Sequence, residues 1–248
     1  SKRTCHSIDL AIWGESQDLT SNSASVTYGV DRKAIFSNQG LREILREITM
    51  YAIAVNGSPR KGGNTELLLK AVIDELSSAG WETERVSVGG TAIRGCLACQ
   101  KCFENKDNRC ANDTDEFNDI FSKLVRADAM ILGSPTYFAA ISADLKALTE
   151  RAGYVAFANG HAFAGKIGAA VVAVRRGGAT HAYDTINHMF QMSKMIIPGS
   201  TYWNMGVGLH KGDILQDPEG LANMRHLGKC IAWLGNAIKP HIADYPQD

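Results

Sequence analysis

The sequence predicts an α/β fold built around a doubly wound parallel sheet of five strands, with helices on both faces. Two patterns carry this prediction. Short apolar segments typical of buried strands recur at residues 51–55, 129–132, 167–174 and 195–197. Amphipathic stretches long enough for helices separate them, and a helical crossover is what returns a chain to the start of a parallel strand.

The remaining elements continue this alternation. Residues 83–88 alternate polar and apolar side chains, which is typical of a strand near a sheet edge. The expected helices cover residues 65–79, 115–126, 143–152, 180–193 and 219–239. Ligands of such sheets bind at the carboxyl ends of the strands. The loops that follow the strands are therefore where a site is expected.

The bulk composition narrows the class of protein. The 248 residues carry 26 basic and 26 acidic side chains, so the basic excess of a nucleic-acid-binding protein is missing and no such partner is expected. No run of ~18 apolar residues occurs, so no membrane partner is expected. The first seven residues lack the pattern of a secretory signal. Four of the six cysteines cluster between residues 96 and 110, which indicates a metal or redox site in a reducing compartment such as the cytoplasm.

The chain divides near Met50. Residues 1–49 are polar and show no sustained periodicity, apart from a short amphipathic stretch at 41–48 that is expected to form a helix. Residues 50–248 form the predicted domain, which contains a cysteine-rich loop at 91–112. Two interpretations of the first segment are open. It is either an extension upstream of a natural start at Met50 or an arm that packs on a partner subunit.

The loop after the first strand has the composition of a phosphate-binding turn. It reads N-G-S-P-R-K-G-G-N-T from residue 56 to residue 65, and a helix follows. Small residues let backbone N–H groups approach an anion at a helix N-terminus. The candidate ligands for that anion are Ser58, Arg60, Asn64 and Thr65. Because neither the G-x-x-x-x-G-K-S/T nor the G-x-G-x-x-G pattern is present, a terminal monophosphate such as that of FMN suits the loop better than a pyrophosphate. The alternative is a plain strand-to-helix turn with Asn64 or Thr65 as N-cap.

Two further loops at strand ends suit a flat ligand. The first follows the strand at 129–132 and presents backbone amides and aromatic surface through Pro135, Thr136, Tyr137 and Phe138. The second follows the strand at 167–174 and contains Arg175, Arg176, Gly177 and Gly178. Paired glycines let the main chain approach a flavin ring, and N–H donors there stabilise negative charge on the reduced ring. The alternatives are a buried aromatic anchor and a solvated arginine pair.

The cysteine loop follows a C-x2-C-x2-C-x7-C pattern formed by Cys96, Cys99, Cys102 and Cys110. Spacings of two residues place successive thiolates on one side of a tight loop, where they can ligate corners of one iron–sulfur cluster. Four thiolates also satisfy tetrahedral zinc. Reduced thiols without metal and a redox-active disulfide pair are the other open alternatives.

The G-S-P-R and N-T elements of the first loop, at residues 57–60 and 64–65, resemble those of the flavodoxin-like NAD(P)H-dependent FMN reductase family. Together with the cysteine cluster, the sequence most resembles the iron–sulfur flavoproteins of that family. The resemblance covers residues 50 to about 240. It implies strand order 2-1-3-4-5, an FMN whose isoalloxazine lies along residues 135–138, a 4Fe–4S cluster on the four cysteines, and a homodimer or homotetramer.

The expected function is an FMN-dependent oxidoreductase, that is, an NAD(P)H-dependent FMN reductase. Electrons would pass from NAD(P)H or a ferredoxin-like carrier through FMN to an acceptor such as flavin, a quinone or a carrier protein. No catalytic side chain is expected, because the flavin carries the chemistry. The alternative is a non-enzymatic flavoprotein that shuttles electrons between protein partners.

Overall fold

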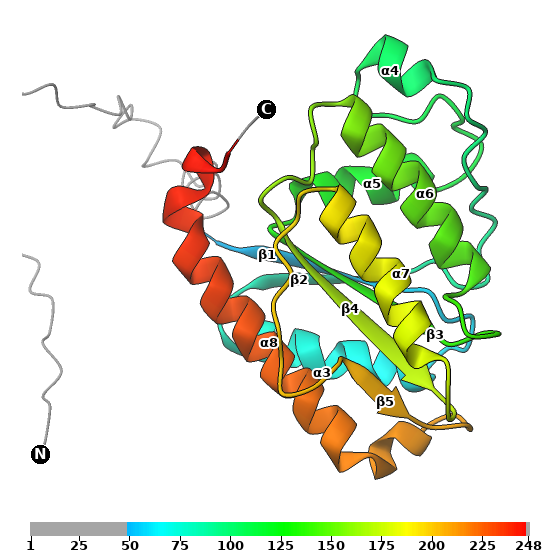
Figure 1. The fold of residues 1–248 in the computed structure, drawn as a ribbon, viewed down its shortest axis with the longest axis vertical. Coiled ribbons are helices and arrows are strands. Elements are labelled where there is room, and N and C mark those ends of the chain that lie inside the picture. Colours follow the sequence, from blue (N-terminus) through cyan, green and yellow to red (C-terminus); the bar gives the residue numbers. More distant parts are fainter. Residues whose placement is uncertain (1–48, 247–248) are drawn as a thin grey trace, which may run out of the picture. The chain divides into compact units, whose positions relative to one another are not determined.

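The computed structural model describes residues 49–246, and a five-stranded parallel sheet forms its centre (Figure 1). The strand order is β2-β1-β3-β4-β5, as the resemblance implies. The strands are β1 (Tyr51–Asn56), β2 (Glu82–Ser87), β3 (Ala129–Pro135), β4 (Ile167–Val174) and β5 (Met205–Val207). The prediction of a doubly wound parallel sheet is confirmed. The N-terminal extension or arm expected at 1–49, including the helix expected at 41–48, lies outside the described residues except for its last position.

Helices cover both faces of the sheet. The α-helices are α3 (Asn64–Ser78), α4 (Lys101–Asn105), α5 (Phe117–Arg126), α6 (Ala143–Ala158), α7 (Ala179–Met192) and α8 (Pro218–Ile238). Two 3-10 turns follow β5 and α8, η1 (Asp213–Gln216) and η2 (Lys239–Asp244). Helices α3 and α8 pack together on one face, and α5, α6 and α7 lie on the other (Figure 1).

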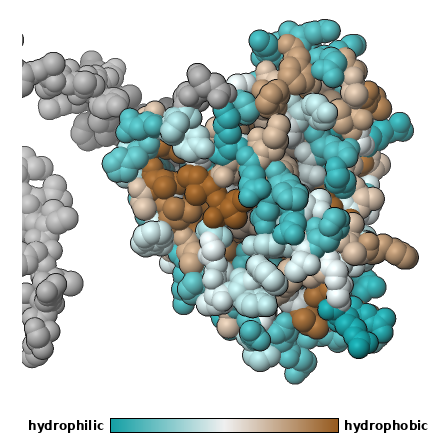
Figure 2. Space-filling view, in the orientation of Figure 1, coloured by the Kyte–Doolittle hydropathy of each residue, from teal (hydrophilic) through white to brown (hydrophobic). Residues whose placement is uncertain are grey.

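The alternation of side chains along the strands supplies a separate core to each face. In β1, Ile53 and Val55 join the core beneath α5, α6 and α7, whereas Ala52 and Ala54 face α3 and α8. Strands β1, β3 and β4 are buried along their whole length, as expected for central strands. The edge strand β2 is largely exposed, which confirms the prediction from its alternating sequence. Apolar residues on the surface gather beside the C-terminal half of α8, away from the carboxyl ends of the strands (Figure 2).

The fifth strand is not where the sequence placed it. Residues 195–197 make only a single bridge, in which Ile196 pairs with Ile167. The strand beside β4 is instead β5, ten residues later, and its Gly206 lies opposite Ala173. A Cβ on Gly206 would meet Ile214 Cδ1 at 2.4 Å, so glycine is needed there to admit the side chains behind the strand. This requirement hides the strand from a propensity-based prediction.

Two helices also differ from expectation. Helix α6 continues to Ala158 instead of ending at residue 152. The cysteine loop contains a short helix that was not predicted, α4, which begins at Lys101 and includes Cys102. Its N-cap, Gln100, has a left-handed backbone with φ 62°. Such turns allow the closely spaced cysteines to curl around a common centre.

Candidate functional site

A cavity of about 210 Å³ opens at the carboxyl ends of the strands. Strand register explains the meeting of its loops, because Asn56 lies beside Gly133 and Pro135 lies beside Ala173. Eight residues predicted to bind the cofactor line this cavity: Ser58, Arg60, Asn64, Thr65, Pro135, Thr136, Tyr137 and Arg175. The other lining residues are Ala173, Gly208, Leu209 and Lys211. The structure thus brings together loops that are more than 100 residues apart in sequence.

Two hydrogen bonds from backbone N–H groups fix the first turn of the loop predicted to bind phosphate, residues 56–65. The backbone N–H of Ser58 donates to Asn56 Oδ1 at 3.0 Å, and that of Gly57 donates to the Gly133 carbonyl at 2.8 Å. A Cβ on Gly57 would lie 2.8 Å from both Leu145 Cβ and Ser142 Oγ. Glycine is therefore required where the loop passes between β3 and α6. The buried Ser58 hydroxyl accepts from the Arg60 N–H at 3.3 Å, which folds the loop back toward α3.

The segment after β5 forms the second wall of the cavity. The Asn64 amide donates to the His210 carbonyl at 2.9 Å and accepts from the Gly212 N–H at 3.0 Å. Arg60 Nη1 donates to the Leu209 carbonyl at 3.1 Å. These bonds fasten the two walls to each other. The alternative in which Asn64 or Thr65 caps the helix is wrong, because the N-cap of α3 is Gly63 and no side chain caps it.

The charged side chains that line the cavity favour an anion. Its lining contains three cations, Arg60, Arg175 and Lys211, and no carboxylate. The N-terminus of α3 adds backbone N–H donors and the positive end of the helix dipole. Lys211 was missed by the sequence analysis, because it follows the strand that was misplaced. Its ammonium end lies close to Gly62 in the phosphate loop, within 3.1 Å of where a Cβ would stand.

One polar group at the cavity has no partner among the described residues. Thr136 Oγ1 is buried and makes no hydrogen bond. Buried hydroxyls without partners are costly, so this atom indicates a ligand that supplies one.

Four predicted residues lie outside this cavity. Arg176, Gly177 and Gly178 line an adjacent cavity of about 350 Å³, which Tyr202 and Trp203 also line. Phe138 lines neither cavity. It is fully exposed at the tip of its turn, where its φ of 49° is left-handed. Gly178 lies close to the loop that contains Thr136, because a Cβ there would meet Ala139 Cα at 2.9 Å and Thr136 Cγ2 at 3.5 Å.

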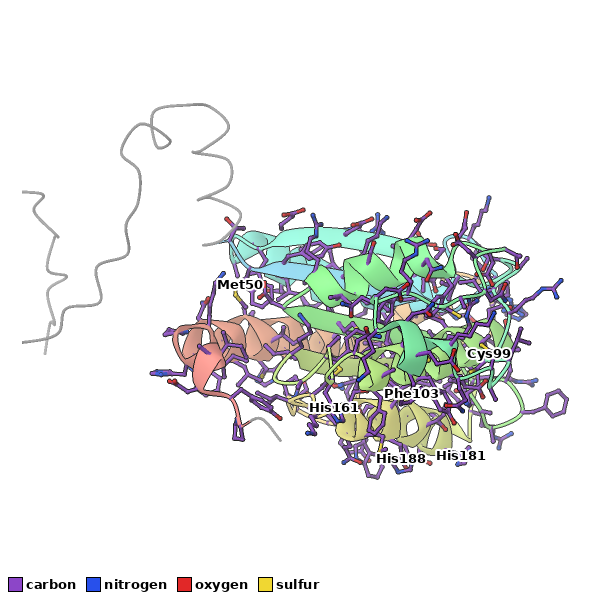
Figure 3. The ribbon with its side chains drawn as sticks, turned by 90° about the horizontal axis from the view of Figure 1, so that it is seen from above. Met50, Cys99, Phe103, His161, His181 and His188 are labelled. Atoms are coloured by element: carbon purple, nitrogen blue, oxygen red, sulfur yellow. The ribbon has the colours of Figure 1, made fainter. Side chains whose placement is uncertain are left out.

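The four cysteines of the motif meet at a separate small cavity, which all of them line. Figure 3 shows Cys99 at the opposite end of the molecule from Met50, the residue that precedes β1. Asn118 closes the loop, since its side chain accepts from the Cys110 N–H at 2.8 Å and donates to the Cys110 carbonyl at 3.0 Å. Burial, together with the neighbouring Cys96 and Cys110, raises the pKa of the Cys102 thiol.

The thiols surround this cavity without converging on a point. Within residues 49–246, no three His, Cys, Asp or Glu side chains lie close enough to hold a single metal ion. His181 and His188, seven residues apart, are both exposed on α7 (Figure 3). No helix in the described part of the chain is long and apolar enough to span a membrane.

The sheet topology and the anion cavity at its carboxyl edge define a flavodoxin-like protein. Comparison with known proteins supports this class. The model of the NADPH-dependent FMN reductase family matches residues 50–210, and the chain belongs to that family. It is therefore a flavoprotein whose cofactor is FMN and whose chemistry is oxidoreduction.

Individual relatives refine the comparison. An iron–sulfur flavoprotein of Methanocaldococcus jannaschii is 36% identical over 197 residues, which cover 77% of this chain and 100% of the relative. Two solved structures share the fold at low identity. RosB with the bound intermediate 8-demethyl-8-formylriboflavin-5′-phosphate is 16% identical, with a TM-score of 0.63 over 78% of this chain and 82% of that one. A WrbA-like flavodoxin from Agrobacterium tumefaciens is 14% identical, with a TM-score of 0.55 over 76% and 99%.

Proposed function

We propose that the cavity at the strand ends holds FMN, with its phosphate at the loop of residues 58–65 and its ring along residues 135–138 and 175–178. The observation that carries this proposal is the lining of three cations without a carboxylate, at the N-terminus of α3. The unpartnered Thr136 hydroxyl fits the same ligand, because a flavin offers it hydrogen-bond partners.

The reaction that fits this site is electron transfer from NAD(P)H or a ferredoxin-like carrier to a flavin, a quinone or a carrier protein. FMN, when bound, supplies the hydride and electron chemistry. The chain's own side chains bind and orient the cofactor. Arg60 and Lys211 neutralise the phosphate, and Arg175 places positive charge at the mouth of the cavity. The adjacent cavity with Tyr202 and Trp203 has room for a planar electron donor or acceptor beside Gly178.

The cysteine cavity supports a 4Fe–4S cluster better than zinc. Zn–S bonds of ~2.3 Å hold four thiolates within ~3.8 Å of one another. The four thiols here line one cavity, and no three of the described ligand-type residues approach closely enough for a single ion. The cysteine pattern and the 36% identical relative, which is named an iron–sulfur flavoprotein, both favour a multi-iron cluster. Cys96, Cys99, Cys102 and Cys110 are its proposed ligands.

No residue lines both the cysteine cavity and the FMN cavity. A homodimer or homotetramer would bring the cysteine cavity of one copy near the flavin of another. The fully exposed Phe138 and the half-exposed Tyr202 and Trp203, which surround the flavin loops, support such an assembly. A reducing compartment such as the cytoplasm suits the free thiols. Light scattering of the intact chain measures the number of copies.

Anaerobic purification followed by a visible spectrum and assays of iron and acid-labile sulfide tests both cofactors together. We expect flavin bands and about four irons per chain. Stopped-flow mixing with NADPH then separates an enzyme from a carrier. Bleaching of the flavin at a catalytic rate supports the reductase. If NADPH leaves the flavin oxidised while reduced ferredoxin bleaches it, the alternative of a non-enzymatic electron carrier is correct.

A further inference from the structure

Beneath the cysteine loop lies a buried arginine that the sequence motifs do not mark. Arg151, on α6, is 1% exposed. Its Nη1 donates to Asp115 Oδ2 at 2.6 Å, and its guanidinium stacks on the Phe117 ring at 4.0 Å. Burial by itself would raise the pKa of Asp115, but bonds from the Arg94 N–H and from Arg151 hold that pKa below its ordinary value. The two side chains form an ion pair that is buried on both sides.

The same guanidinium fastens both ends of the cysteine loop. Nη1 also donates to the Arg94 carbonyl at 3.3 Å, and Nη2 donates to the Asn112 carbonyl at 2.7 Å. Arg94 lies two residues before Cys96, and Asn112 lies two residues after Cys110. One side chain therefore fixes the span that carries all four thiols.

The remaining donor of Arg151 is unused. Nε is buried and has no hydrogen-bond partner among the described residues. Arg151 also lines the cavity that the four cysteines surround, whose lining contains no other cation and no carboxylate. Leaving a buried donor of a charged group unpaired costs free energy. The unpaired Nε of Arg151 therefore points to an acceptor that fills the cavity.

We propose that Arg151 is the positioning residue of the cysteine site. Its Nε–H donates to sulfur of the thiolate-bound group, and its positive charge stabilises that group after one-electron reduction. This inference rests on the proposed 4Fe–4S cluster. Reduction potentials of such clusters depend on hydrogen bonds to sulfur and on nearby charge. The side chain thus shapes the loop and also sets the potential at which the cluster accepts an electron.

Five variants, one of them the conservative R151K, separate the electrostatic role from a merely structural one. In each, the midpoint potential is measured by anaerobic dithionite titration followed by electron paramagnetic resonance, together with iron and sulfide per chain. R151M leaves the Asp115 carboxylate without its cationic partner, and D115N leaves the Arg151 guanidinium without its anionic partner. R151M/D115N removes both charges. It leaves no uncompensated charge in the core, so it provides a removal of Arg151 that can be measured even if R151M folds poorly. The control is R109M, whose arginine pairs with Asp113 in the same loop but is half exposed.

We expect R151M to lower the potential and D115N to raise it. At a fixed potential, the ratio of reduced to oxidised cluster should change at least tenfold in each direction, or ~59 mV for one electron. R151K should recover part of the shift, and R109M should leave the potential unchanged because solvent screens its charge. In metal-free chains, R151M should also speed the reaction of the loop thiols with a disulfide reagent, because the loop ends are released.

Two contrary results overturn the inference in distinguishable ways. A cluster whose potential is the same in wild type, R151M, D115N and the double variant contradicts the role of Arg151 and leaves the cluster proposal intact. A wild-type chain that retains no iron or sulfide after anaerobic reconstitution overturns both proposals.

Discussion

The hydroxyl of Thr136 offers a residue-scale test of the flavin site. It is buried without a partner although its residue lines the anion cavity. In Thr136→Val, a methyl group replaces the hydroxyl, so the flavin-free chain should gain ~1 kcal/mol of unfolding free energy. FMN should bind ~2–10-fold more weakly, because one net hydrogen bond is worth ~0.5–1.5 kcal/mol. Denaturant titration and flavin fluorescence quenching measure the two effects.

Ser142 provides the matched control. Its Oγ is also buried without a partner, but Ser142 does not line the cavity. Ser142→Ala should therefore stabilise the flavin-free chain and leave FMN affinity unchanged. Equal FMN affinity in Thr136→Val and wild type would show that the flavin does not use this hydroxyl.

Tyr51 makes the stability of the fold dependent on alkaline pH. Burial and the hydrogen bond from its hydroxyl to Glu84 at 2.7 Å raise the pKa of Tyr51 to about 12. A tyrosine of the unfolded chain loses its proton near pH 10. The stabilisation is therefore complete below about pH 10 and is lost as the pH rises toward 12, because only the unfolded state ionises in that range.

Tyr51→Phe should abolish this part of the pH dependence. Between about pH 9 and 11.5, its unfolding free energy should fall by up to ~2 kcal/mol less than that of wild type. Urea denaturation at the two pH values measures the difference. The exposed Tyr154 supplies a control, and Tyr154→Phe should behave as wild type. Parallel losses in all three chains would contradict the assigned pKa.

Among the elements, those with strong periodicity were predictable and those selected by close packing were not. Central strands β1, β3 and β4 read directly from apolar runs because both of their faces are buried. Strand β5 could not be predicted in this way, because its central residue must be Gly206 to make room for Ile214 and Leu68. The apolar segment at 195–197 misled the prediction, since Met195 is buried in the core without joining a ladder. In both cases tertiary contacts, and not local propensity, determine whether a segment forms a strand.

The turn into α7 carries an element-scale prediction. Gly178 has φ +86°, and a Cβ there would lie 2.9 Å from the backbone of Ala139, in the loop that follows Thr136. Gly178→Ala should cost at least ~1–2 kcal/mol from the left-handed backbone alone, and it should weaken FMN binding by pushing that loop. The neighbouring Gly177 has open space around it, so Gly177→Ala should be neutral. Thermal unfolding and flavin titration compare the pair, and similar values would argue against contact between the two loops.

At the scale of the whole molecule, parallel topology made much of the site predictable. Three loops that follow different strands had to meet at one edge of the sheet, and eight of the residues named from sequence do line one cavity there. The sequence could not show that Arg176, Gly177 and Gly178 line the neighbouring cavity. Arg175 and Arg176 are adjacent in the turn after β4 but line different cavities, and this depends on the conformation of the turn. The sequence also did not reveal Lys211 and Arg151, whose roles depend on contacts across more than 30 residues of chain.

The most direct test of the flavin site compares FMN with riboflavin, which lacks only the phosphate. If Arg60, Lys211 and the start of α3 hold that phosphate, two charge-assisted hydrogen bonds of ~1.5–3 kcal/mol each predict at least ~100-fold tighter binding of FMN. Fluorescence quenching titrations of the flavin-free chain, with Lys211→Met alongside, measure the ratio. We expect a large ratio in wild type and a smaller one in Lys211→Met. Equal affinities of wild type for FMN and riboflavin would contradict the assignment of the phosphate cradle.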